Sequence, residues 1–370
     1  MPSSSLSAAQ LRRRRLAGQR LRGTPYRDAA TLVRTLGAVQ AQDYAGATWA
    51  LAMRLPAGTT EAQLDAAFDR GEILRTHVLR PTWHFVTPED IRWMIALTGP
   101  RILSGDAKRL RDLELDARTL DRAVHALERA LRGGRSFTRA EVRETLARAG
   151  VDASNTERFA HVMMFAELQS LVCSGVRRGA QTTTYALLDE RAPAIGARRL
   201  GREEAVCELV RRYFGTHGPA TLHDFVVWSG LTIADARMGL EAHGDAFRSA
   251  TLDGLGWWFA ADADSAPRSS GARLLPNFDE YFIGFKHRAP LLARRHAQGA
   301  ALDPRDLLAH VIEVDGQLVG GWKRVARGKA TAVTLSPAVT LSARERSAVE
   351  REAERFGRFL ETDVAVSWPR

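Results

Sequence analysis

The sequence predicts a mainly α-helical protein of the α+β class, in which helix pairs alternate with small β hairpins. The order helix, short turn, helix and strand pair recurs three times along the 370-residue chain. After residue 271 the periodicity changes to a run of strands followed by one long helix. Because helix–turn–helix followed by a hairpin is typical of a winged helix, we expect three tandem winged-helix units and a C-terminal α/β unit.

The clearest unit covers residues 133–198. Thr138-Arg-Ala-Glu141 has the pattern of a capping box and predicts a helix to about Ala149. The other expected elements follow in order: a helix over 155–171, strands over 171–176 and 183–188, and between them the basic loop 177–181.

A second copy of the pattern covers residues 199–261. We expect a helix from about Arg202 to Thr216, ended by Gly218-Pro219. Asp253-Gly254 is a strong signal for a tight hairpin. The remaining expected elements are helices over 221–228 and 232–242 and strands over 247–252 and 255–260.

The first unit, residues 1–132, shows a looser version of the pattern. Ser7-Ala-Ala-Gln10 caps a basic helix, and Thr76–Val86 is the expected wing. Further helices are expected over 27–38, 60–70 and an arginine-rich region of roughly 101–132.

The last unit, residues 272–370, follows a linker of Ala, Asp, Ser and Pro over 261–271. Strands are expected over 272–276 and 309–335, with tight turns at Asp315-Gly316 and Arg327-Gly328. Ser342 caps a final amphipathic helix to about Leu360.

The charge balance points to a polyanionic partner. Lys and Arg number 53 against 43 Asp and Glu, a net charge of +10, which favours nucleic acid. No apolar run approaches the roughly 18–20 residues of a membrane helix, and no apolar segment follows the N-terminal arginines as in a secretory signal. Cys173 and Cys207 are too few for a disulfide framework. We therefore expect a cytoplasmic protein without membrane contact.

The residue inventory offers little conventional catalytic chemistry. No His or Cys motif has metal-ligand spacing, so no metal and no cofactor is expected. Gly320-Gly321 is not followed by the residues of a phosphate loop, and no Gly-x-Ser-x-Gly elbow is present. His77 and His84 are expected to be ordered strand residues.

The polar run Val39-Gln40-Ala41-Gln42-Asp43-Tyr44 is different in kind. Side chains at i and i+2 lie about 200° apart on a helix but on the same side of an extended segment. If the run is extended, both carboxamides converge on one point. The alternative is that Gln40 and Gln42 only bind backbone groups.

Four segments together resemble the AlkZ/YcaQ family of winged-helix DNA glycosylases. They occur in the expected order and span nearly the whole chain: Val39-Gln-Ala-Gln42, Thr76-His-Val-Leu-Arg-Pro-Thr-Trp-His84, Leu275-Pro-Asn-Phe-Asp-Glu-Tyr281 and Val314-Asp-Gly-Gln-Leu-Val-Gly-Gly-Trp322. The resemblance implies three winged helices in a C shape around double-stranded DNA. Gln40-Ala41-Gln42 is similar to the Gln–apolar–Gln signature of the antibiotic-producer branch, which releases bulky alkylated bases and unhooks interstrand crosslinks.

The resemblance nominates Gln40 and Gln42 as catalytic. Asp43 is a reserve candidate for a general base, and Thr82 and His84 are candidates for lining the lesion site. A carboxamide has no useful pKa but can orient a water, which suffices when a cationic N7-alkylated purine departs as a neutral base. None of the four lysines lies near Gln40 in sequence, so we expect hydrolysis without lyase chemistry.

Two further segments receive expected roles. Arg327-Gly328-Lys329, at a predicted hairpin tip, is the candidate DNA-binding element, with an ordinary solvated turn as its alternative. Trp83 is expected in the core, and Phe278–Tyr281 is expected to link the last unit to the first.

The expected protein is thus a monomeric, monofunctional DNA glycosylase for N7-alkylated purines, serving repair or self-resistance. Two alternatives from other classes stay open: a non-catalytic winged-helix regulator that binds DNA, and a packing module in a larger assembly. Neither alternative gives the Gln pair a role.

Overall fold

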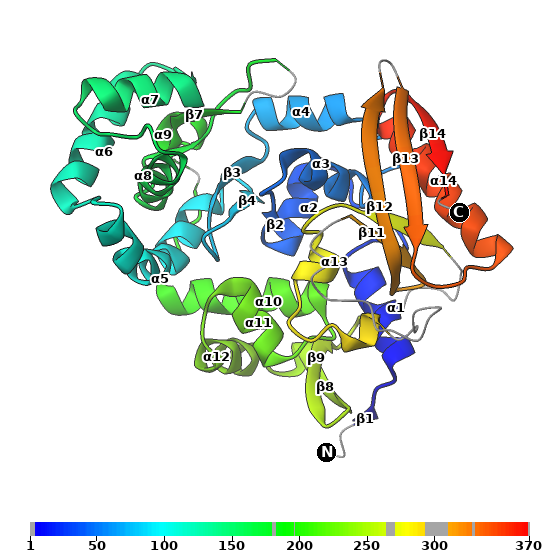
Figure 1. Ribbon diagram of the computed structural model, residues 1–370. Helices are drawn as coiled ribbons and strands as arrows, with labels where there is room; N and C mark the ends of the chain where they lie inside the picture. The colour runs from blue at the N-terminus through cyan, green and yellow to red at the C-terminus, as the bar shows by residue number, and fades with distance from the viewer. Residues whose placement is uncertain are drawn as a thin grey trace. The chain divides into compact units, whose positions relative to one another are not determined.

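The computed structural model describes residues 4–179, 183–195, 197–263, 271–292, 310–327 and 330–368 (Figure 1). By its contacts the chain forms two compact units. The first contains Met1–Asp65, Cys207–Trp228 and Thr232–Arg370, and the second contains Ala66–Val206 and Ser229–Leu231. No helix among the described residues is long and apolar enough to cross a membrane.

The N-terminal part of the first unit is helical. The Ser7 side chain accepts from the Gln10 N–H in a complete capping box, as predicted. Gly37 ends the second helix with a left-handed φ of 93°. The elements are β1 (Ser4–Ser5), α1 (Ala8–Gly18), α2 (Ala29–Leu36), β2 (Val39–Gln40), α3 (Tyr44–Ala52) and α4 (Glu61–Asp69), the last continuing into the second unit.

The next helices of this unit carry the hairpin predicted at Asp253-Gly254. Both turn residues have positive φ, 51° and 73°, as a two-residue turn between twisted strands requires. Leu252 pairs with Leu255, and the hairpin gains a third strand because β1 pairs parallel with its first strand. The elements are α10 (Arg202–His217), α11 (Leu222–Ser229), α12 (Ile233–His243), η1 (Gly244–Ala246), β8 (Phe247–Leu252) and β9 (Leu255–Ala260).

The C-terminal part of the first unit is a five-stranded mixed sheet in the order β10-β11-β12-β13-β14. Helix α14 packs on β10 and β14 (Figure 1). Asp315 and Gly316 have φ values of 49° and 81°, which confirms the predicted tight turn. The elements are β10 (Ala272–Leu275), α13 (Glu280–Ile283), η2 (Ala289–Leu291), β11 (Val311–Val314), β12 (Gln317–Arg327), β13 (Ala330–Pro337), α14 (Ala343–Leu360) and β14 (Asp363–Ser367).

The second unit packs its helices around a core that includes Leu127, Leu146 and Met163. The capping box of Thr138 and Glu141 is confirmed. The elements are β3 (Leu74–His77), β4 (Trp83–Val86), α5 (Ile91–Asp112), α6 (Ala117–Leu131), β5 (Phe137–Thr138), α7 (Arg139–Arg148), α8 (Thr156–Leu168), β6 (Val172–Ser174), β7 (Thr184–Leu187) and α9 (Leu188–Arg191).

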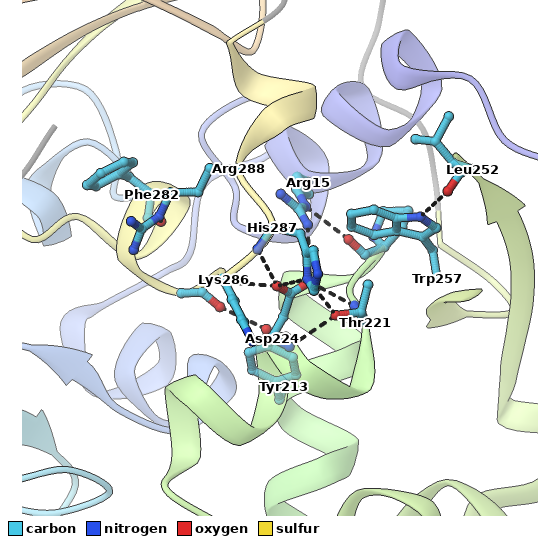
Figure 2. A network of polar contacts seen from close by, with 12 residues as sticks. Arg15, Tyr213, Thr221, Asp224, Leu252, Trp257, Phe282, Lys286, His287 and Arg288 are labelled. Atoms are coloured by element: carbon cyan, nitrogen blue, oxygen red, sulfur yellow. Dashed lines mark hydrogen bonds and ion pairs between the residues drawn. The ribbon is translucent and has the colours of Figure 1, made fainter. Parts of the chain in front are cut away.

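A buried polar network joins α1, α11 and the segment after α13 (Figure 2). The Asp224 carboxylate accepts from the backbone N–H groups of Thr221, Lys286 and His287 at 2.7–2.8 Å. The Arg15 guanidinium lies 3.8 Å from Asp224 and 3.4 Å from the centre of the Phe285 ring, and both charged side chains are fully buried. Charged groups thus fix the packing of segments far apart in the sequence.

The fold class is confirmed: the chain is mainly helical, with small hairpins and a C-terminal α/β region. The structure differs from the sequence prediction in several elements, and the prediction also lacks β1, β5, α9 and α13. The helical region expected over 101–132 starts earlier and is two helices, since Glu114 adopts a left-handed φ of 54° and Asp116 caps α6. Helix α3 is not predicted from the sequence because all residues from Gly46 to Ala52 are buried, which leaves no amphipathic period. Strand β14 is also absent from the prediction.

Several expectations fall partly or wholly outside the described residues. These are the tip residues Gly328 and Lys329, part of the basic loop 177–181 and most of the linker 261–271. The boundaries of the four units, 1–132, 133–198, 199–261 and 272–370, stay predictions.

Candidate active site

Gln40, Gln42 and Asp43 lie on the short connection between α2 and α3. Strand β2 ends at Gln40, and the chain then bends through Gln42 and Asp43. Asp43 is the N-cap of α3, where its Oδ1 accepts from the Gly46 N–H at 3.2 Å. The strand therefore ends at Gln40, and a bend at Gln42 separates it from Asp43, whose own backbone is extended.

The two glutamines differ in exposure. Gln40 is 8% exposed, whereas Gln42 is an exposed residue. The site thus combines a buried glutamine residue with an exposed one.

A buried carboxylate from a distant part of the chain holds the backbone of Gln40. Glu280, the first residue of α13, is 1% exposed, and its Oε1 accepts from the Gln40 N–H at 2.8 Å. Its Oε2 accepts from Trp228 Nε1 at 2.9 Å and lies 3.4 Å from His217 Nε2. Buried carboxylates need such donors, because burial of an unpaired charge costs several kcal/mol.

The imidazole of His217 lies beside the Glu280 carboxylate. It stacks on Tyr213 with ring centres 4.7 Å apart, and its Nδ1 lies 2.9 Å from Thr216 Oγ1. Burial lowers the pKa of His217, although the hydrogen bond and the charge of Glu280 act in the opposite direction. A largely neutral imidazole follows from this balance at neutral pH.

A second buried ion pair fixes the residue before Glu280. Arg54 binds Asp279 through two hydrogen bonds of 2.8 and 2.9 Å, and also donates to Gln19 Oε1 at 3.0 Å. The Gln19 amide in turn donates to the Glu280 carbonyl at 3.3 Å. The segment 278–281 therefore connects the C-terminal part of the chain to the N-terminal helices, as the sequence predicts.

Thr82 and His84 belong to the second unit. His84 is fully buried on β4, and its Nδ1 lies 2.9 Å from the Thr82 carbonyl. Trp83 donates to Glu167 at 3.2 Å and packs on His77 with ring centres 4.7 Å apart. It is only half-buried, so it lies at the edge of the core and not inside it, where the sequence predicts it. A role for Thr82 or His84 toward a lesion stays a prediction.

The candidate DNA-binding hairpin is formed by β12 and β13. Arg327 pairs with Ala330 as the last pair of the ladder, so the expected strands are present on both sides of the turn (Figure 1). The contact of Arg327, Gly328 and Lys329 with DNA stays a prediction.

Sequence reasoning missed Glu280, His217 and Trp228 as the residues that surround the Gln40 backbone. For Glu280 the sequence predicts only a structural link. One signal could have indicated more: Asp279 and Glu280 are consecutive acids directly before the apolar run Tyr281-Phe-Ile283. Acids are rarely buried unless they are paired, so burial of this apolar run would require partners for the carboxylates beside it.

A comparison with families of known proteins identifies the class to which the chain belongs. A family model described as DNA glycosylase AlkZ-like matches residues 33–359, nearly the whole chain. The chain therefore belongs to the AlkZ-like DNA glycosylase family, which confirms the resemblance drawn from its four sequence segments. It is a DNA glycosylase, a hydrolase of N-glycosyl bonds.

Two comparisons with individual proteins agree with this family. The chain is 23% identical over 342 residues to the interstrand DNA cross-link repair glycosylase of Streptomyces sahachiroi, covering 89% of this chain and 90% of that protein. It also resembles the solved structure of the Streptomyces sahachiroi DNA glycosylase AlkZ, with a TM-score of 0.76 and 23% identity, over 99% of this chain and 100% of that one. The structural likeness shows that the two share a fold.

Proposed function

We propose that this glycosylase releases N7-alkylated, cationic purines from duplex DNA, with Gln40 and Gln42 orienting the attacking water. The observation that supports this role is the hydrogen bond from the Gln40 N–H to the buried Glu280 carboxylate. It fixes the backbone that carries one carboxamide, and the second lies two residues further along at the solvent.

The chemistry of the residues matches a cationic leaving group. Alkylation at N7 gives guanine a positive charge, so the base departs neutral and needs no general acid. The oxocarbenium-like sugar that remains requires a positioned water and nearby oxygen dipoles, which carboxamide oxygens supply. Normal guanine, an uncharged and poor leaving group, is spared.

The proposed reaction is hydrolysis without strand cleavage. A lyase step needs an amine that forms a Schiff base, and the chain contains only four lysines. Lys108 lies in the second unit beside Asp112, at 3.6 Å, and none of the four follows Gln40 closely in sequence. We therefore infer a monofunctional enzyme whose product is an abasic site.

The substrate range extends to interstrand crosslinks. The relative from Streptomyces sahachiroi is named a cross-link repair glycosylase. Because the Gln pair has to contact only the sugar and a water, the group attached to N7 is under little constraint. Release of one crosslinked base would unhook the two strands, and release of the second would free the crosslink from the DNA.

The test is excision from an oligonucleotide duplex that carries one N7-methylguanine. We expect alkali-labile ends to accumulate at the lesion, and no cleavage before alkali is added. A duplex with unmodified guanine at the same position is the control. Binding without formation of abasic sites would support the non-catalytic regulator instead.

A further inference from the structure

A pocket of about 400 Å³ in the first unit has strongly basic walls. It is lined by the loop after α1, the loop after α3, strand β10 with Gly271 before it, and helix α14. Its charged lining residues are five arginines and one glutamate: Arg20, Arg273, Arg351, Arg355, Arg358 and Glu352. It is separate from the Gln40 and Glu280 pair, since neither residue lines it.

The inner part of the pocket is a fixed Arg–Glu–Arg group. Arg273 donates to the carbonyls of Ala272 and Leu21 at 2.8 and 2.7 Å, and Arg355 donates to the Ala52 carbonyl at 2.8 Å. The carboxylate of Glu352 lies 3.6 Å from Arg273 and 3.5 Å from Arg355. One carboxylate thus pairs with two guanidinium groups, so the group has a net charge of about +1.

The remaining three arginines are exposed. Arg351 and Arg358 lie seven positions apart on α14, so they share one face of the helix with Arg355 between them. Arg20 adopts a left-handed φ of 55° and lies over the Tyr26 ring at 5.8 Å. Within the part of the chain that the structure describes, none of the three forms an ion pair with a carboxylate.

The charges of the pocket are therefore poorly balanced. Five guanidinium groups face a single carboxylate, and like charges at close range raise one another's free energy. Burial lowers the pKa of Arg273 to about 10, because the guanidinium loses part of its hydration there. An anion in the pocket would relieve both effects.

A phosphate group fits this arrangement best. Guanidinium forks bind phosphate oxygens through paired hydrogen bonds, and several forks around one concave site suit a group with two or more negative charges. A single carboxylate ligand would leave most of these donors unused.

We propose that this arginine pocket binds a phosphate group. The group belongs either to the DNA backbone or to a free polyphosphate. The proposal does not depend on the catalytic role of the Gln pair.

The first experiment measures binding of inorganic pyrophosphate by calorimetry at constant ionic strength. The test variant is R351Q/R358Q, which removes two exposed arginines from the pocket wall and should not disturb the core. The control is R344Q/R346Q, which removes two exposed arginines of the same helix that do not line the pocket. We expect the test variant to bind at least about tenfold more weakly than wild type, and the control to bind within about twofold.

The second experiment identifies the source of the phosphate through binding to an undamaged duplex at several salt concentrations. If the group belongs to DNA, pyrophosphate competes with the duplex, and R351Q/R358Q lowers the slope of log K against log salt by about 0.9 for each phosphate that the variant no longer binds. If the group is free, the slope is unchanged and pyrophosphate binds beside DNA. Equal pyrophosphate binding by wild type, test and control proteins, with an unchanged slope, would overturn the proposal.

Discussion

The backbone N–H of Gln40 donates a hydrogen bond of 2.8 Å to Oε1 of Glu280, across 240 positions of sequence. The other oxygen of this carboxylate accepts from Trp228 on α11. Residues from three segments far apart in the sequence therefore fix the position of the Gln40 backbone. The relationship connects the proposed catalytic residue to the buried core of its unit.

Removal of either glutamine side chain should slow base excision without loss of DNA binding. We expect Gln40→Ala and Gln42→Ala each to lose about 2–4 kcal/mol of transition-state stabilisation, or about 30- to 1000-fold in rate. Gln42→Glu should retain some of the activity, because a carboxylate still accepts from water. Single-turnover excision of N7-methylguanine measures this, with exposed Gln169→Ala as the control. Wild-type rates in both alanine variants would contradict this role of the two glutamines and favour Asp43 as the general base.

Substitution of Glu280 should affect the rate more than the affinity. Glu280→Gln keeps one acceptor oxygen but loses the charge, so we expect a single-turnover rate reduced by about tenfold with duplex affinity within about twofold. Glu280→Ala should be worse, because it leaves the donors of Gln40 and Trp228 buried without an acceptor. The exposed Glu354→Ala on α14 is the control. An equal loss of rate and affinity would indicate general unfolding rather than positioning.

The Arg15 and Asp224 pair should control stability. Asp224→Ala leaves a buried guanidinium without its counter-charge, and we expect a loss of about 3–5 kcal/mol in the free energy of unfolding. Denaturant unfolding followed by circular dichroism measures it. Glu241→Ala, which removes an exposed carboxylate on α12 of the same unit, serves as the control. A loss below about 1 kcal/mol would contradict the importance of the network.

The same pair predicts a loss of stability in acid. Burial alone raises the pKa of Asp224, but hydrogen bonding from His287, the charge of Arg15 and backbone N–H groups outweigh it and lower the pKa. The carboxyl group of Asp224 therefore binds its proton less tightly in the folded state than in the unfolded state, where the pKa of an aspartate is about 3.9. This contribution is complete above that pH and disappears as the pH falls through the folded pKa. Unfolding curves measured from pH 6 to 3, about one pH unit apart, should show that the free energy of unfolding falls less with acid for Asp224→Asn than for wild type.

Removal of the charges at the tip of the β12–β13 hairpin should weaken DNA binding to the same extent for all DNA sequences. We expect Arg327→Ala and Lys329→Ala to lower the slope of log K against log salt by about 0.9 for each phosphate that is no longer bound. Overlapping salt dependence of the double variant and wild type would identify the tip as a plain solvated turn.

Lesion charge should matter more than lesion size. We expect bulky or crosslinked N7 adducts to be released within about tenfold of N7-methylguanine, a difference of roughly 1.4 kcal/mol. The uncharged 1,N6-ethenoadenine should react far more slowly, because its departure needs an acid. Matched duplexes in single turnover provide the comparison, and efficient release of the uncharged base would reveal a general acid in the site.

The sequence by itself determined the elements whose signals are local. Capping boxes at Ser7, Thr138 and Ser342 begin helices in the structure, and Asp253-Gly254 and Asp315-Gly316 form the expected turns. Each of these features depends on side chains or backbone angles within about four residues, so the pattern is visible in the chain. The four segments in order also identified the family.

Only the tertiary structure decided the surroundings of the Gln pair and the arginine pocket. Helix α3 is buried from Gly46 to Ala52 and has no periodic signal, and the bend at Gln42 directly precedes its N-cap, Asp43. Glu280 reaches Gln40, and Arg20 joins Arg351 and Arg358 in one pocket, because the packing of distant helices and strands brings them together. Such contacts depend on the sum of many buried interactions, for which no short stretch of sequence carries a signal.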